Sequence, residues 1–213
     1  MKKLFVTDLR NVPAAVSLLG SVFDKEKVER HPVSIVNWKD FPYRPEVSFR
    51  IAHNGTNILL NFRVEEADVK AVCDKDGGKV WEDSCVEFFI SFDQQSYYNI
   101  ETNCIGSVLV ATGKDRHART PLPESVLKRI KRFSSLGAMP LEKEYATWEL
   151  SLLIPLDVFA DTGITDLSGQ KATGNFYKCG DNQKTPHFIS WNPIGSETPD
   201  FHRPEFFGDI YFE

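Results

Sequence analysis

Hydrophobic and polar residues alternate over much of the chain with a period of two, which is typical of half-buried β-strands. The segment 77–92 shows this alternation, and one parity of its positions is apolar: Val86, Phe88, Ile90 and Phe92. The runs 47–53 and 57–64 flank an Asn-Gly pair and therefore predict a β-hairpin. A further core strand is predicted before Pro155 from another apolar parity: Trp148, Leu150, Leu152 and Ile154.

Short β-like runs continue to the C-terminus, at 172–181, 187–193 and 204–212. Only two segments resemble helices, an apolar-to-charged run at 13–29 and a short basic run at 124–131. Many short strands with turn residues between them favour an all-β sandwich or barrel. No linker or repeat interrupts the pattern, so we expect one domain over residues 1–213, with its core at about 30–213.

The strand at 86–92 and the next one, at 97–104, define a common register. In antiparallel neighbours, directly opposed side chains lie on the same side of the sheet. A slip by one residue would expose one apolar set to water, so we expect an odd number of residues in the connecting loop. The opposite face then collects a Trp with carboxylates and amides: Trp81, Asp83, Glu87, Tyr97, Asn99, Glu101 and Asn103.

That face contains no Lys or Arg, unlike many solvent-facing sheets. A solvated face is one interpretation of it. The other is a sugar site, in which an aromatic ring covers C–H groups and polar side chains bond hydroxyls. A second cluster near the C-terminus contains Lys178 and Trp191, and Trp191 is expected at a strand end, reaching a loop rim. Trp38 and Trp148 are assigned to the core.

Composition narrows the function. The chain of 213 residues has a formal charge of −5, which argues against nucleic acid as a partner. Its four cysteines form no C-x-x-C pair, so we expect them to be reduced, without a zinc or redox motif. The N-terminal apolar run stops at Asp8, too early for a signal peptide, and no stretch is long enough to span a membrane. We therefore expect a soluble protein, cytoplasmic rather than exported, although export stays open.

Five segments together resemble carbohydrate-binding module family 9-like proteins of the DOMON-like β-sandwich group: VWEDSCVEFFISF, YYNIETNCIGS, NFYKCGD, HFISWNP and PEFFGDIYF. The resemblance covers about residues 30 to 213. It implies a jelly-roll-like β-sandwich without catalytic activity, in which two Trp rings clamp the end of a sugar.

A Glu that follows the first Trp by six residues bonds the sugar in this family, and Trp81 and Glu87 match that spacing. Trp191 is the candidate for the second Trp. Asn99, Glu101 and Lys178 are further candidates for contact with sugar hydroxyls.

Other family features are harder to place in this sequence. The family's Arg ligand has two candidates, Arg116 and Arg119. The resemblance also implies structural calcium, but no Asp-rich loop supplies its ligands, and we expect no other cofactor. Because such modules are usually attached to xylanases, a glycoside-processing enzyme is a candidate partner.

Three alternatives stay open. Glu87 and Glu101 could form the carboxylate pair of a glycoside hydrolase. Some DOMON-like domains bind haem, although the two Met residues here are poorly placed as axial ligands and the five His residues are expected on loops or strand edges. The domain could also be an interaction module without a sugar ligand.

Overall fold

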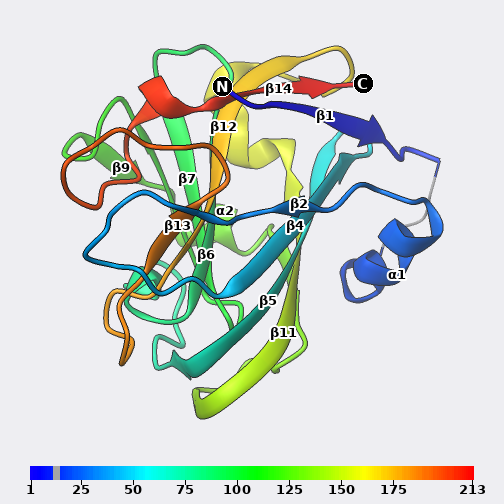
Figure 1. Cartoon of the computed structure of the whole chain (residues 1–213). Helices are drawn as coiled ribbons and strands as arrows, with labels where there is room; N and C mark the ends of the chain where they lie inside the picture. The colour runs from blue at the N-terminus through cyan, green and yellow to red at the C-terminus, as the bar shows by residue number, and fades with distance from the viewer. Residues whose placement is uncertain (12–14) are drawn as a thin grey trace.

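The strands of the chain form a curled β-sandwich, seen in Figure 1 as one group containing β4, β5 and β11 and another containing β6, β7 and β12. The computed structural model describes residues 1–11 and 15–213. The first sheet has the order β10-β11-β5-β4, and β2 also pairs with β4. Its strands are β2 (His31–Pro32), β4 (Glu46–His53), β5 (Asn57–Ala71), β10 (Lys131–Ser134) and β11 (Leu141–Pro155).

The second sheet has the order β14-β12-β6-β7-β8-β9, and β13 joins β3 to β12. Its strands are β3 (Ile35–Val36), β6 (Cys85–Ser91), β7 (Tyr97–Asn103), β8 (Val108–Gly113), β9 (Arg119–Pro121), β12 (Lys171–Cys179), β13 (Phe188–Ser190) and β14 (Gly208–Phe212). Strand β1 (Lys3–Asp8) runs parallel to both β14 and β4 and so connects the two sheets. This first strand is part of the sandwich, although the expected core began at about residue 30.

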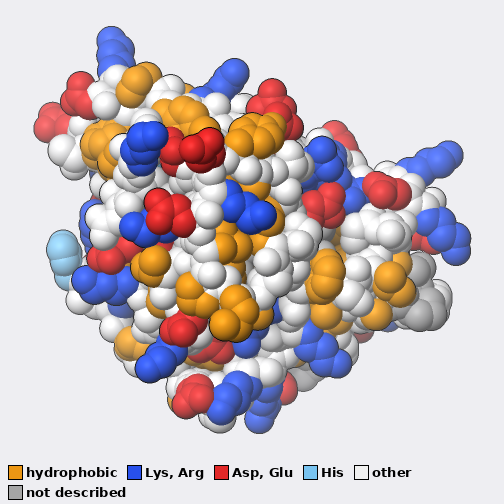
Figure 2. Space-filling view, turned by 90° about the horizontal axis from the view of Figure 1, so that it is seen from below, with side chains coloured by type: hydrophobic (Ala, Val, Ile, Leu, Met, Phe, Trp, Pro, Cys, Tyr) orange, Lys and Arg blue, Asp and Glu red, His pale blue; other side chains and the backbone are white. Residues whose placement is uncertain are grey.

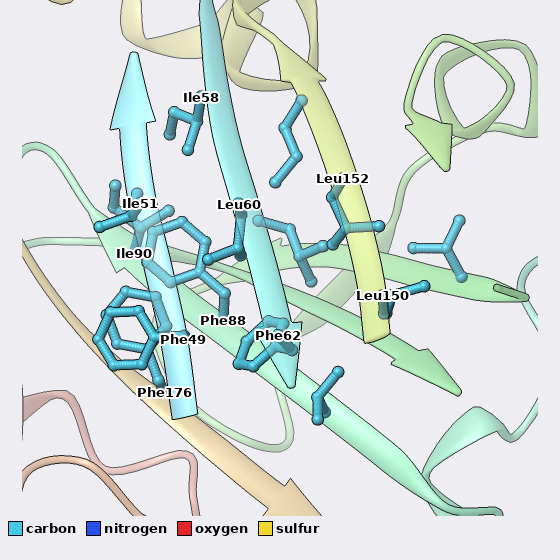
Figure 3. Close-up of a cluster of buried hydrophobic side chains, with 14 of the residues drawn as sticks. Phe49, Ile51, Ile58, Leu60, Phe62, Phe88, Ile90, Leu150, Leu152 and Phe176 are labelled. Atoms are coloured by element: carbon cyan, nitrogen blue, oxygen red, sulfur yellow. The ribbon is translucent and has the colours of Figure 1, made fainter. Parts of the chain in front are cut away.

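The hydrophobic core lies between the sheets. Phe176 of the second sheet stacks on Phe49 of the first, with ring centroids 3.6 Å apart, and on its neighbour Phe88 at 4.6 Å (Figure 3). The predicted apolar parity is confirmed: Val86, Phe88 and Ile90 are buried, as is the whole predicted set of β11. Phe92 is only half-buried, because it lies just beyond the end of β6.

The predicted register and turns are also confirmed. Phe88 pairs with Ile100, and the loop between β6 and β7 has the expected odd length, residues 92–96. His53 pairs with Ile58 across the predicted hairpin. Gly55 has φ +86 in its turn, a conformation that favours glycine.

The helices are short. Helix α2 (Glu124–Leu127) falls inside the predicted segment 124–131 and is shorter than it. The predicted segment 13–29 contains the 3-10 turn η1 (Val16–Leu18) and helix α1 (Leu19–Lys25), while its first two residues lie outside the described chain. Leu19 and Phe23 pack on the outer face of the first sheet. Turns η3 (Leu156–Thr162) and η4 (Pro204–Phe206) complete the elements.

One predicted strand boundary was wrong. Residues 80–82 form the 3-10 turn η2 (Val80–Glu82), so Trp81 does not belong to β6, which begins at Cys85. Asp83 explains why a turn stands here in place of a strand. Its buried carboxylate accepts hydrogen bonds from the backbone N–H groups of Val72 and Cys73. The backbone is therefore fixed to a neighbouring strand end before the ladder of β6 starts.

One face of the molecule mixes both signs of charge (Figure 2). Figure 2 shows acidic and basic side chains interspersed among hydrophobic ones on one face of the molecule. This distribution agrees with the small net charge of −5. On that face, no extended area of one sign stands out that would attract a polyanion.

Candidate functional site

The outer face of the second sheet contains a cavity of about 350 Å³. Its floor is made by alternate residues of five adjacent strands, and loops form its rim. The lining residues are Trp81, Glu87, Asn99, Glu101, Leu109, Ala111, Arg116, Arg119, Pro121, Cys179, Asp181, Phe188, Pro199, Asp200, Phe201 and His202. The period of two that buries Phe88 in the core therefore also turns Glu87 toward the cavity.

Two carboxyl groups lie side by side in the floor. Glu87 of β6 is directly opposite Glu101 of β7 in the ladder, and both side chains are almost fully buried. The Asn99 side chain donates a hydrogen bond of 2.8 Å to Oε1 of Glu101. The Cys179 thiol donates to Oε1 of Glu87 at 3.1 Å. Each carboxyl group thus has a neutral partner.

Burial disfavours the ionised form of these acids. It raises the pKa of Glu101 to about 7, although the Asn99 hydrogen bond and the charge of Arg119 oppose the shift. Burial, together with the nearby thiol of Cys179 and the carboxyl of Glu101, raises the pKa of Glu87 well above its ordinary value. Burial also raises the pKa of Asp181 to about 6. Protonated carboxyl groups can donate as well as accept hydrogen bonds, which suits ligands rich in hydroxyl groups.

Both candidate arginines line the cavity, and they are held differently. The guanidinium of Arg119 lies 4.0 Å from the ring centroid of Tyr97 and donates to the carbonyl groups of Gly113, Tyr97 and Ala111. It also donates to the Asn99 side chain. Arg116 is more exposed and lies 3.5 Å from Asp200. Arg119 is therefore a fixed part of the cavity wall.

The aromatic side chains of the cavity come from several segments. Trp81 is half-buried on turn η2, and Phe188 and Phe201 lie on β13 and the C-terminal loop. His202 hydrogen-bonds the Tyr97 hydroxyl at 2.9 Å. Sequence reasoning missed Phe188 and Phe201, because it searched for a second Trp. Phe188 belongs to the HFISWNP segment, in which Trp191 was the predicted residue; Phe188 lines the cavity and Trp191 does not.

Two predicted site residues lie elsewhere. Trp191 is buried in the core between the sheets, edge-on to Phe49 and Phe176, and does not reach a loop rim. Lys178 is fully buried and pairs with Glu66 at 2.8 Å. The strand pairing explains why Lys178 faces the core. Lys178 pairs with core-facing Val86, whereas its neighbour Tyr177 pairs with Glu87. Of the six predicted residues, the cavity brings together Trp81, Glu87, Asn99 and Glu101.

Potential metal ligands gather at one point of the floor. Among residues 1–11 and 15–213, one group of three has ligand atoms within 4.8 Å of one another: Cys85, Glu87 and Cys179. A group with two thiols does not suit calcium, because calcium favours oxygen ligands. Calcium therefore stays a prediction without identified ligands.

Comparison with known proteins agrees with this architecture. The model of carbohydrate-binding family 9 matches residues 17–212. The chain belongs to carbohydrate-binding family 9. A solved structure from Bacteroides uniformis ATCC 8492, described as a candidate carbohydrate-binding protein, is 46% identical, with 100% of this chain and 99% of that chain covered and a TM-score of 0.96.

Two more distant structures share the fold. Both are family 9 carbohydrate-binding modules from Caldicellulosiruptor kristjanssonii. One is a complex with cellotriose, at 12% identity, TM-score 0.64, and coverage of 100% of this chain and 94% of that chain. The other is a complex with glucose, at 13% identity, TM-score 0.62, and coverage of 100% and 96%. Among curated proteins, no sequence matches the chain.

The described helices are all too short or too polar to cross a membrane. The expectation of a cytoplasmic location gains no support from the family, and it stays a prediction.

Proposed function

We propose that the cavity binds the end of a mono- or oligosaccharide without converting it. Its volume of about 350 Å³ is in the range of small-ligand sites, which is roughly 300–1,000 Å³. The observation that carries the proposal is the composition of the floor and wall. An aromatic ring, two buried carboxyl groups and an amide converge on one hollow of a sheet: Trp81, Glu87, Glu101 and Asn99.

The polar groups supply both donors and acceptors. Glu87 and Glu101 each make a single side-chain contact with a neutral group, which leaves capacity for sugar hydroxyls. The Nε atom of Arg119 is buried and has no hydrogen-bond partner among the described residues. This nitrogen has almost no accessible surface, so the hydrogen-bonding capacity that a ligand can use comes mainly from the two carboxyl groups.

Trp81 supplies the apolar contact. Covering about 50 Å² of an apolar sugar face contributes about 1.2 kcal/mol at roughly 25 cal/mol per Å². A few hydrogen bonds at about 1 kcal/mol each add to this, and the entropy of association offsets part of the gain. We therefore expect affinities in the micromolar to millimolar range.

A binding function is favoured over hydrolysis by the family to which the chain belongs, because the matched family 9 structures are carbohydrate-binding modules. A pair of carboxyl groups such as Glu87 and Glu101 is also what a glycoside hydrolase would use. Incubation with cellotriose therefore tests whether the site cleaves a glycosidic bond.

Calorimetric titration with glucose, cellobiose and cellotriose tests the proposal. Glucose and cellotriose are the sugars bound in the distant family 9 modules. Trp81→Ala should weaken binding about tenfold, the equivalent of the stacking contribution. Phe133→Ala is the matched control, because Phe133 is an exposed aromatic residue outside the cavity.

Two results would contradict the proposal. One is sugar binding that persists in folded Trp81→Ala while its melting temperature falls sharply, which would make Trp81 a packing residue. The other is the appearance of shorter sugars when cellotriose is incubated with the protein, which would establish hydrolysis. An enzyme as partner of this module stays a prediction.

A further inference from the structure

The ladder between β6 and β12 brings two thiols together beside a carboxyl group. Cys85 pairs directly with Cys179, and both face the same side of the sheet as Glu87. Cys179 Sγ lies 3.1 Å from Oε1 of Glu87, and all three ligand atoms lie within 4.8 Å of one another. The three residues are at most 4% exposed.

These distances are close to those that a tetrahedral metal requires. With Zn–S bonds of about 2.3 Å and Zn–O bonds of about 2.0–2.2 Å, two sulfur ligands lie roughly 3.8 Å apart, and sulfur and oxygen somewhat less. Small rotations of the three side chains would therefore bring them to one ion. Thiolates select soft or borderline ions, such as Zn²⁺ and Co²⁺, over Ca²⁺ and Mg²⁺.

The cluster is connected to the cavity. Cys179 and Glu87 line it, while Cys85 lies behind them. An ion held by these three residues would have its fourth position toward the hollow, where water or a hydroxyl group can bind. The cavity also provides the path by which an ion reaches buried ligands.

We propose that Cys85, Cys179 and Glu87 form a three-residue site for a thiophilic divalent cation, with its fourth position open to the cavity. As each metal–sulfur bond forms, the thiol proton leaves to solvent, so no oxidant or reductant is required. The site shares Glu87 with the proposed sugar site, but cation binding is measured without sugar, so the failure of one proposal does not decide the other.

Cobalt titration of the reduced, metal-free full chain tests the site. We expect one equivalent of Co²⁺ to produce a sulfur-to-cobalt charge-transfer band, which Zn²⁺ should abolish and Mg²⁺ should not. Zn²⁺ should also raise the melting temperature, because a ligand of the native state stabilises it. Cys85→Ser and Cys179→Ser should weaken Co²⁺ binding by at least about 100-fold, and Glu87→Gln by at least about tenfold.

The other two cysteines provide matched controls. Cys104 is equally buried but lies in the core between the sheets, and Cys73 is half-exposed. Cys104→Ser and Cys73→Ser should keep the band. Circular dichroism checks that each variant folds, and Cys179→Ala replaces Cys179→Ser if the hydroxyl disturbs packing.

Two outcomes would overturn the site. One is wild-type protein that shows neither a band nor a rise in melting temperature, in which case the thiols only fill space. The other is a band that survives in Cys85→Ser and Cys179→Ser but is lost in Cys73→Ser, which would reveal adventitious binding at the accessible thiol.

Discussion

Neighbouring residues on the two faces of the second sheet can be almost equally buried and chemically opposite. Phe88 and Glu87 are adjacent in β6 and are 0% and 4% exposed. Phe88 packs between the sheets on Phe176, whereas Glu87 lies in the floor of a hollow beside Glu101 and Cys179. Burial alone therefore does not distinguish core from site in this protein.

Buried ionisable groups also have different partners on the two faces. On the core side, Lys178 pairs with Glu66 at 2.8 Å, and Glu66 also accepts hydrogen bonds from Ser84 and Trp148. On the cavity side, Glu87 and Glu101 have only neutral hydrogen-bond partners. The core-side network is complete, which indicates a structural role, whereas the cavity-side carboxyl groups keep unused hydrogen-bonding capacity.

The largest effect is expected on the core side. Phe88→Ala should lower the free energy of unfolding by about 4 kcal/mol, because it removes a ring from a stack and leaves a cavity that its neighbours cannot fill. Denaturant unfolding monitored by fluorescence measures the loss. Sugar affinity in the remaining folded fraction should be unchanged, and a loss of affinity as large as the loss of stability would refute the separation of the two faces.

Lys178→Met should cost about 3 kcal/mol. It removes one partner of a buried ion pair, which is strongly destabilising, but Glu66 keeps two hydrogen bonds. Chemical denaturation of the double variant Lys178→Met, Glu66→Gln provides the control, and it should regain part of the stability. If Lys178→Met is as stable as the wild type and instead loses sugar affinity, then Lys178 belongs to the site after all.

The alternation of the sequence was sufficient to predict the sandwich, the register of β6 and β7 and the residues on each face of them. The prediction was wrong where a side chain outside this pattern determines the backbone conformation. Trp81 lies on a 3-10 turn because the carboxylate of Asp83 holds the chain to a neighbouring strand end. No period of two contains that information.

The two predicted site residues near the C-terminus lie outside the cavity for a different reason. Lys178 was chosen by residue type, but its parity on β12 faces it to the core, which only the pairing with β6 determines. Trp191 was chosen as a second ring, whereas the other aromatic rings that line the cavity include Phe188 and Phe201. These positions depend on how the C-terminal loop folds over the sheet, and such long-range packing is not encoded in any local pattern.

The core-side network also predicts a dependence of stability on pH. The Nε2 atom of His187 accepts a hydrogen bond of 2.7 Å from the Lys178 ammonium group. The Nδ1 atom of the same ring lies 2.9 Å from the carbonyl oxygen of Thr185. Burial, aided by the charge of Lys178, lowers the pKa of His187 to about 3. The unfolded chain, with an ordinary histidine pKa of about 6.5, therefore takes up the proton first as the pH falls.

It follows that stability should fall as the pH decreases from about 6.5 toward 3, by up to about 1.4 kcal/mol per pH unit from this histidine. Unfolding curves of the wild type and His187→Gln between pH 7 and 5 measure the difference in slope, and the variant should be flatter. His117→Gln, at an exposed position, is the control. Equal slopes in the wild type and His187→Gln would show that His187 is not held neutral.

The smallest effect on stability is expected for Arg116→Gln, on the cavity side. Arg116 is 56% exposed and its nitrogen lies 3.5 Å from Asp200, so its ion pair is screened by solvent and the change in stability should stay below about 0.5 kcal/mol.

Arg119→Gln is the matched variant. It leaves the carbonyl groups of Tyr97, Ala111 and Gly113 without their donor and should cost about 1–3 kcal/mol. Thermal unfolding of both variants, followed by titration with glucose, separates the roles of the two arginines. If Arg116→Gln loses sugar affinity at full stability, Arg116 contacts the ligand directly. If the two variants are equally stable, then Arg119 is not the structural arginine of the wall, and the fixed side of the cavity must be sought elsewhere.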